Sequence, residues 1–95
     1  MVFVATAYCQ GTTTATGATV RRGIVAADPA VLPLGAVISV ERSGQYDGVY
    51  TVMDTGPKIQ GRHVDLFIRD CAAAKRFGRQ TVQVRILDAG HDRVP

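Results

Sequence analysis

Three aspartates lie within or directly after apolar runs of this chain. A charged side chain in such a run lowers the stability of the fold unless it is paired, so its presence calls for an explanation. Asp54 directly follows the run 49–53, and Asp65 lies inside the run Val64-Asp65-Leu66-Phe67. Asp28 ends the short run 24–27. Because burying an unpaired carboxylate is unfavourable, carboxyl groups in such places are candidates for proton-transfer chemistry.

Each of these acids also has a structural interpretation. Asp54 precedes Thr55-Gly56, where an acid suits a turn. Asp28 precedes Pro29, so it suits a turn or the cap of a single helical turn. Asp65 is the hardest to explain structurally, since its neighbours are apolar and no turn residue follows it. We therefore expect function at Asp65 first.

The triplet Asp54-Thr55-Gly56 after an apolar run is also the motif of aspartic proteases. A chain of 95 residues has the length of a retroviral-type protomer, which supplies one aspartate to a shared pair. Here, however, the motif lies past the midpoint, and Gly61 follows it too closely to match the later apolar-glycine element of those proteases. That interpretation also leaves Asp28 and Asp65 unexplained, so it is the less favoured alternative.

The scaffold for these acids is predicted to be mainly β. β-Branched, aromatic or alternating apolar residues predict strands over 2–9, 24–27, 36–41, 49–53, 63–68 and 80–87. One short helix is predicted over 71–76, with Asp70 as its N-cap and Gly78 just after its end. This pattern is typical of a small barrel of six or seven strands. We expect one domain over 1–95, with a core over about 2–87 and a polar tail over 88–95.

Two long loops connect the predicted strands near the acids. The loop 10–23 is rich in threonine and glycine, and its Thr14, Thr16 and Gly17 are candidates for contacts with a polar ligand. A solvated loop without such a role is an equally good interpretation. The loop 55–62 joins the strand before Asp54 to the strand that holds Asp65.

Composition narrows the class of protein. The net charge is +3, from nine arginines and two lysines against eight acids. The basic residues are scattered without interleaved aromatic residues, which favours solubility over nucleic-acid binding. No run of about eighteen apolar residues predicts a membrane span, and no leader is visible, as expected for a trimmed mature domain.

Cysteine and histidine are scarce. Cys9 and Cys71 cannot form a zinc site by themselves, and the sequence leaves a disulfide and two free thiols both open. His63 and His91 are far apart without ligand-like spacing, so we expect no metal or cofactor.

Several short motifs, weak alone, follow one another in a specific order over residues 5–87. They are Thr6-Ala7-Tyr8, Thr14-Ala15-Thr16-Gly17, Gly23-Ile24-Val25-Ala26-Ala27-Asp28-Pro29, Leu32-Pro33-Leu34-Gly35, Asp54-Thr55-Gly56, Ile59, Gly61, Val64-Asp65-Leu66-Phe67, Ala74, Phe77-Gly78, Val82 and Val84. Together they resemble the three-aspartate (3D) domain family, which occurs in bacterial wall-associated proteins and in the catalytic barrel of membrane-bound lytic transglycosylase A.

The resemblance implies a double-psi β-barrel that cleaves the glycan strands of peptidoglycan. A lytic transglycosylase breaks the MurNAc–GlcNAc β-1,4 bond without water and leaves 1,6-anhydroMurNAc ends. The resemblance implies Asp65 as the catalytic acid/base, with Asp54 and Asp28 as supporting acids. The substrate contacts that we expect are Thr16, Gly17, Thr55, Gly56, Lys58 and His63. An extracytoplasmic monomer acting on peptidoglycan is implied as well.

The chemistry of one carboxyl agrees with this assignment. Ordinary glycosidases use two carboxyl groups, but here the C6 hydroxyl of the muramic sugar attacks its own anomeric carbon. One carboxyl can protonate the leaving oxygen and then deprotonate that hydroxyl. Asp65 must then be protonated near neutral pH, and an apolar strand with a neighbouring carboxylate raises its pKa.

The chain departs from the family pattern at two positions. Pro57 replaces a second glycine after Asp54-Thr55-Gly56, and His63 replaces an arginine or similar residue. On a strand, His63 and Asp65 share a face, so a protonated His63 would lower the pKa of Asp65. We favour a neutral surface histidine over a second acid/base. A double-psi barrel that binds wall polysaccharide without cutting it, as expansin-like domains do, is the main alternative function.

Overall fold

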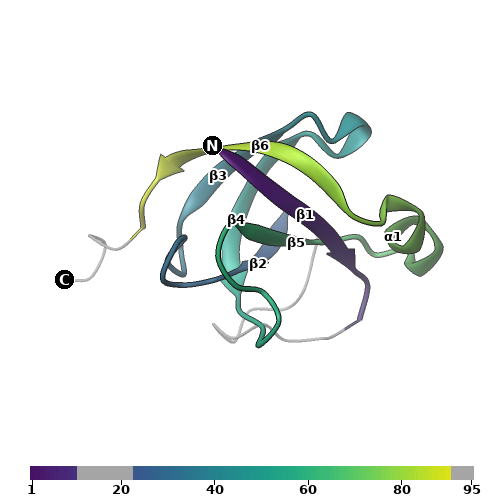
Figure 1. The fold of residues 1–95 in the computed structure, drawn as a ribbon, viewed down its shortest axis with the longest axis horizontal. Helices are drawn as coiled ribbons and strands as arrows, with labels where there is room; N and C mark the ends of the chain where they lie inside the picture. Colours follow the sequence, from purple (N-terminus) through teal and green to yellow (C-terminus); the bar gives the residue numbers. More distant parts are fainter. Residues whose placement is uncertain (11–22, 91–95) are drawn as a thin grey trace.

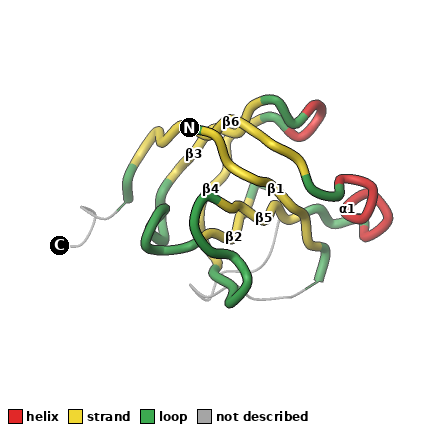
Figure 2. The backbone as a smooth tube through the Cα atoms, viewed as in Figure 1, coloured by secondary structure: helices red, strands yellow, loops and turns green. Residues whose placement is uncertain are grey.

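The computed structural model describes residues 1–10 and 23–90 of the chain. Within these residues the chain is mainly β, with one α-helix and one 3-10 helix (Figures 1 and 2). The elements are β1 (Val2–Tyr8), β2 (Ile24–Ala27), β3 (Val37–Glu41), η1 (Gly44–Tyr46), β4 (Gly48–Asp54), β5 (His63–Phe67), α1 (Cys71–Phe77) and β6 (Gln80–Asp88).

The six described strands form a closed barrel in the order β1-β5-β2-β4-β3-β6, and β6 pairs back to β1. The pairs β1–β5 and β2–β4 are parallel, whereas the other pairs are antiparallel. Closure leaves no unpaired sheet edge, which a small β-domain otherwise has to protect. The prediction of a small, mainly β barrel is confirmed.

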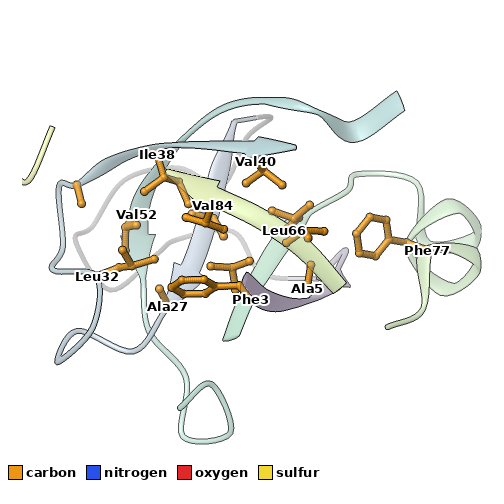
Figure 3. Close-up of a cluster of buried hydrophobic side chains, with 14 of the residues drawn as sticks. Phe3, Ala5, Ala27, Leu32, Ile38, Val40, Val52, Leu66, Phe77 and Val84 are labelled. Atoms are coloured by element: carbon orange, nitrogen blue, oxygen red, sulfur yellow. The ribbon is translucent and has the colours of Figure 1, made fainter. Parts of the chain in front are cut away.

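The barrel interior is filled by alternate residues of the strands. In β1 and β5, Ala5, Val64 and Leu66 are fully buried, while Thr6 and Asp65 between them are only partly buried. All six strands and α1 contribute to one apolar cluster (Figure 3). Burying each large aliphatic or aromatic side chain there stabilises the folded state by about 1.5–3 kcal/mol relative to leaving it exposed. The period-two pattern therefore fixes which residues of a strand face outward.

Strand β2 is buried on both faces. Val25 and Ala27 belong to the core cluster, whereas Ile24 and Ala26 are buried outside it. A strand covered on both sides is expected to be a continuous apolar run, as 24–27 is. Its central place between β5 and β4 puts it directly between the two strands that carry Asp65 and Asp54.

A bulge in β4 sets the direction of Asp54. Val25 of β2 pairs with Val52, but the next residue, Ala26, pairs with Asp54. Met53 is therefore an extra residue on β4. Since successive side chains of a strand alternate between faces, this insertion moves Asp54 to the face on which Ala26 lies.

The helix α1 lies beside the barrel, on the same side of the view as η1 (Figure 2). Asp70 caps α1 by accepting hydrogen bonds from the N–H groups of Ala72 and Ala73, and Gly78 follows at φ 65°. Both capping predictions are confirmed. Phe77 points from α1 into the core (Figure 3), and its ring meets that of Tyr46 edge-on at 5.4 Å.

A disulfide joins Cys9, just after β1, to Cys71, the first residue of α1. The sequence had left open whether the two cysteines form a disulfide or remain free thiols, and the structure shows the disulfide. The bond ties the end of β1 to the helix across 62 positions of sequence.

The polar tail was predicted to begin at residue 88, but residues 88–90 are still part of the folded barrel. Strand β6 continues through Asp88, and Gly90 is buried with its Cα against the backbone of Gly35 and Ala36. A Cβ at residue 90 would lie 2.6 Å from the carbonyl carbon of Gly35, so only glycine fits there. The prediction took the polar Asp88 as the start of a loose tail. Instead, the Asp88 carboxylate accepts a hydrogen bond from Gly90 N–H and holds the turn that brings Gly90 to the barrel. None of the described helices is long and apolar enough to cross a membrane.

Candidate active site

One row of residues crosses four neighbouring strands and carries two of the three acids. Thr6 of β1 pairs with Asp65 of β5, Asp65 pairs with Ala26 of β2, and Ala26 pairs with Asp54 of β4. Directly paired residues point to the same face of a sheet. That face is the outer one, because the neighbours Ala5 and Val64 point into the core. The two acids therefore flank the small Ala26 side chain on the outside of the barrel.

Asp65 and His63 are joined through one hydroxyl group. Thr6 Oγ1 donates a hydrogen bond of 2.8 Å to Asp65 Oδ1. The same oxygen lies 2.8 Å from His63 Nε2. His63 and Asp65 thus lie on the same face of β5, as predicted, and Thr6 on the adjacent strand β1 bridges the two side chains.

Tyr8 is the other polar residue that β1 brings to this face. Burial, followed by the charges of Asp54 and Asp65, raises the pKa of Tyr8 to about 12. The phenol ring packs edge-on against Phe67, with centroids 5.5 Å apart. Its hydroxyl is buried and has no hydrogen-bond partner among the described residues. Because buried polar groups are normally paired, this hydroxyl is an exception within the part of the chain that the structure describes.

The surroundings of Asp65 favour its neutral form. Burial raises the pKa of the half-buried Asp65 above the ordinary carboxyl value, and the charge of Asp54 raises it further. The Thr6 hydrogen bond and the charge of His63 act in the opposite direction without reversing the shift. A carboxyl group in this state can act as a general acid at a higher pH than an exposed aspartate can.

Asp28 is placed differently from the other two acids. Its Oδ1 accepts a hydrogen bond of 2.9 Å from Ala30 N–H, and its Oδ2 accepts one of 2.8 Å from Gly61 N–H. The bond from Gly61, and then that from Ala30, lowers the pKa of Asp28. The groups that shift the pKa of Asp65 are Thr6, His63 and Asp54. Asp28 therefore has the contacts of a clamp that ties the loop 55–62 to the turn after β2.

Replacing Asp28 with alanine is expected to loosen that loop and lower the melting temperature at neutral pH, because two backbone N–H groups lose their acceptor. The stabilisation is present above the ordinary carboxyl pKa of 3.8 and is lost as the pH falls through the lowered pKa of folded Asp28. The difference in melting temperature between wild type and variant should accordingly shrink in acid.

Thermal unfolding across pH, with hydrogen exchange at Gly61, checks this expectation. Asp28→Asn serves as the matched variant, since its amide oxygen can still accept one of the two bonds, and it should lie between wild type and Asp28→Ala. Equal melting temperatures and equal exchange for all three proteins would contradict the clamp.

The other predicted contact residues fall into three groups. Thr55, Gly56 and Lys58 lie in the loop between β4 and β5, and the first of them donates its N–H to Asp54 Oδ1 at 2.9 Å. His63 lies in β5 beside Asp65. The candidates in the first loop, Thr14, Thr16 and Gly17, lie outside the described residues. The same is true of His91.

Thr6 and Tyr8 were not predicted as site residues. Their motif Thr6-Ala7-Tyr8 contributed to the resemblance, and alternation in β1 puts both side chains on one face. What the sequence does not reveal is the parallel pairing of β1 with β5, which brings Thr6 beside Asp65 across 59 positions. Within the described ranges, no group of three or more histidine, cysteine or acidic side chains gathers that could hold a metal ion.

A family model described as the 3D domain matches residues 23–88, which include Asp28, Asp54 and Asp65. The chain belongs to the 3D domain family. The predicted resemblance is confirmed, and this membership replaces the aspartic protease interpretation of Asp54-Thr55-Gly56.

Two similar curated proteins come from Bacillus subtilis (strain 168). YabE, named for a role in cell wall shaping, is 37% identical over 90 residues, covering 87% of this chain and 21% of YabE. The cell wall-binding protein YocH is 35% identical over 79 residues, covering 79% of this chain and 26% of YocH. This 3D domain thus corresponds to only a small part of the length of each relative.

Solved structures with the same fold include two lytic transglycosylases. E. coli MltA with bound chitohexaose gives a TM-score of 0.66 at 19% identity, covering 78% of this chain and 26% of MltA. LtgG of Burkholderia pseudomallei gives a TM-score of 0.66 at 20% identity, covering 83% of this chain and 27% of LtgG. At such identities the likeness establishes the fold, and the predicted fold class is confirmed.

Proposed function

We propose that this 3D domain is a lytic transglycosylase that cleaves the MurNAc–GlcNAc β-1,4 bond of peptidoglycan. The observation that carries the proposal is the half-buried Asp65, whose pKa is raised by burial and by Asp54, on the outer face of the barrel. The fold that this domain shares with MltA and LtgG supports the same assignment. Asp65 is the single acid/base.

The reaction consists of two proton transfers at Asp65. The protonated carboxyl first gives its proton to the glycosidic oxygen as the bond from that oxygen to the anomeric carbon of MurNAc breaks. The resulting carboxylate then takes the proton of the C6 hydroxyl of the same sugar, whose oxygen bonds to the anomeric carbon. The product is a 1,6-anhydro ring, no water is consumed, and Asp65 ends the cycle protonated.

The remaining candidates support this chemistry in distinct ways. Asp54 keeps Asp65 protonated through its charge and stabilises the positive charge that develops on the sugar ring. Asp28 is a supporting acid that acts by holding the loop 55–62 in place. Thr55, Gly56 and Lys58, together with Thr16 and Gly17, contact the glycan strand, while His63 contacts Thr6 beside Asp65.

The cellular setting of the proposal is extracytoplasmic, with the peptidoglycan glycan strand as partner and the domain acting as a monomer. A disulfide such as Cys9–Cys71 persists in oxidising compartments and is rare in the cytosol. The name of YocH, which matches over most of this chain, describes a protein that binds the cell wall.

The rate of cleavage is expected to fall as the pH rises through the pKa of Asp65, because only the protonated carboxyl can start the reaction. Since the charge of Asp54 raises that pKa, the substitution Asp54→Asn should move the alkaline decline to lower pH. The pH–rate profiles of wild type and Asp54→Asn measure this shift. Glu41→Gln, which removes one negative charge at the exposed end of β3, is the control and should leave the decline unmoved. An unchanged profile in Asp54→Asn would contradict the proposed electrostatic role.

Binding to wall glycan without cleavage is the second candidate function, and the name of YocH favours it. Purified sacculi incubated with the domain separate the two functions, since cleavage releases soluble muropeptides while binding only depletes the protein from solution. We expect release by the wild type and none by Asp65→Asn, with both proteins retained on the sacculi. Retention without release by the wild type would favour the binding module.

A further inference from the structure

Thr6 contacts two ionisable side chains through a single oxygen atom. Its Oγ1 lies 2.8 Å from Asp65 Oδ1 and 2.8 Å from His63 Nε2. The contacts come from adjacent parallel strands in direct register, Thr6 with Asp65 and Val4 with His63. All three polar side chains are partly buried, so their mutual geometry is held by the sheet.

A hydroxyl group has one hydrogen, so the two contacts are linked. When His63 carries a proton on Nε2, that N–H donates to Thr6 Oγ1, and the Thr6 hydrogen is directed to Asp65 Oδ1. Oδ1 is then an acceptor and cannot hold the acid proton. The other oxygen, Oδ2, accepts no hydrogen bond from the described residues. The proton of the neutral carboxyl is thus confined to Oδ2.

We infer that His63 is a positioning residue of this domain: through Thr6 it fixes the orientation of the Asp65 carboxyl and places the acid proton on Oδ2. The inference rests on the proposed function for its catalytic meaning. It gives His63 a role that differs from a sugar contact and from a second acid/base. The contact needs only an N–H at the Nε2 position, so His63 acts without changing its own protonation during the reaction.

Substitution in pairs tests whether His63 acts through Thr6. Thr6→Val and His63→Phe should each lower the rate of product release by up to about tenfold, the effect of losing one hydrogen bond. The double variant should be no slower than Thr6→Val, since the effect of His63 passes through the missing hydroxyl. Thr6→Ser and His63→Gln keep the hydroxyl and the N–H, and both should retain wild-type rates.

Tyr8 provides a matched control for this pair of substitutions. Tyr8 lies on the same strand, β1, close enough for the charge of Asp65 to raise its pKa, but its hydroxyl has no hydrogen bond to Thr6 or to His63. The effects of Tyr8→Phe and His63→Phe should therefore multiply. Multiplying effects of Thr6→Val and His63→Phe would overturn the inference, because His63 would then act on the substrate independently of Thr6.

A second readout does not depend on activity. Nitrogen NMR of His63 near neutral pH should show a proton on Nε2 that exchanges slowly with water, and Thr6→Val should make that exchange fast. A bare Nε2 with the proton on Nδ1 would overturn the inference whatever the activity. If the wild type releases no product while Nε2 is protonated and protected, the proposed reaction fails and the orientation of Asp65 by His63 stands.

Discussion

Asp65→Asn is expected to lower the rate of glycan cleavage by about a thousandfold or more, within the range that general acid–base catalysis contributes. Asparagine has the shape of aspartate, and its amide oxygen can still accept the Thr6 hydrogen bond seen at Oδ1. The amide can neither give a proton to the leaving oxygen nor take one from the C6 hydroxyl. The loss should therefore appear in kcat, with retention on sacculi unchanged.

The same variant should be more stable than the wild type at neutral pH. The pKa of Asp65 is raised in the folded state, so the protonated form stabilises the fold below the unfolded pKa, and this stabilisation is lost as the pH rises through the folded pKa. Asparagine removes the burial cost of the charge. Urea unfolding at neutral pH checks the sign and shows that lost activity is not lost structure. A variant that keeps more than about a tenth of the activity would contradict Asp65 as the acid/base.

Removing the disulfide is expected to lower the free energy of unfolding by about 4 kcal/mol. The Cys9–Cys71 bond spans 62 positions, and a cross-link of that span restricts the unfolded chain by about this amount in the loop-entropy estimate. Small domains have free energies of unfolding of only about 5–15 kcal/mol. The variant Cys9→Ala/Cys71→Ala should consequently unfold at a much lower denaturant concentration.

Denaturant unfolding of the oxidised, reduced and double-alanine proteins measures this effect. The reduced wild type and the double variant should both unfold at a much lower denaturant concentration than the oxidised protein, since both lack the bond. Cys71 is exposed, but Cys9 packs against the core, so the double variant should be somewhat less stable than the reduced wild type. A difference below about 1 kcal/mol between the oxidised and reduced proteins would contradict a stabilising bond between β1 and α1.

Local features of this fold were predictable from the sequence. The strands appear within one or two residues of their predicted bounds, because alternation and β-branched runs determine which face of a strand is buried. The Asp70 and Gly78 caps of α1 were also predictable, since each cap forms within a few residues of chain. Asp65 was the leading candidate acid on local grounds alone.

Features that depend on distant pairing were not predictable. The contact of Thr6 with Asp65 requires the register of β1 against β5, and the placement of Asp54 requires the Met53 bulge. The hydrogen bond from Gly61 to Asp28 joins residues 33 positions apart. Nothing local distinguishes an aspartate that clamps a loop from one that supports catalysis. Likewise, the number of cysteines alone could not decide whether Cys9 and Cys71 form a disulfide.

The central claim is that Asp65 transfers protons within one sugar and that no water enters the product. Mass spectrometry of muropeptides released from purified sacculi in water enriched in heavy oxygen tests this directly. The proposal predicts 1,6-anhydroMurNAc ends that contain no heavy oxygen. Reducing MurNAc ends that carry heavy oxygen would contradict it, and would indicate hydrolysis with Asp54 as the base that activates water.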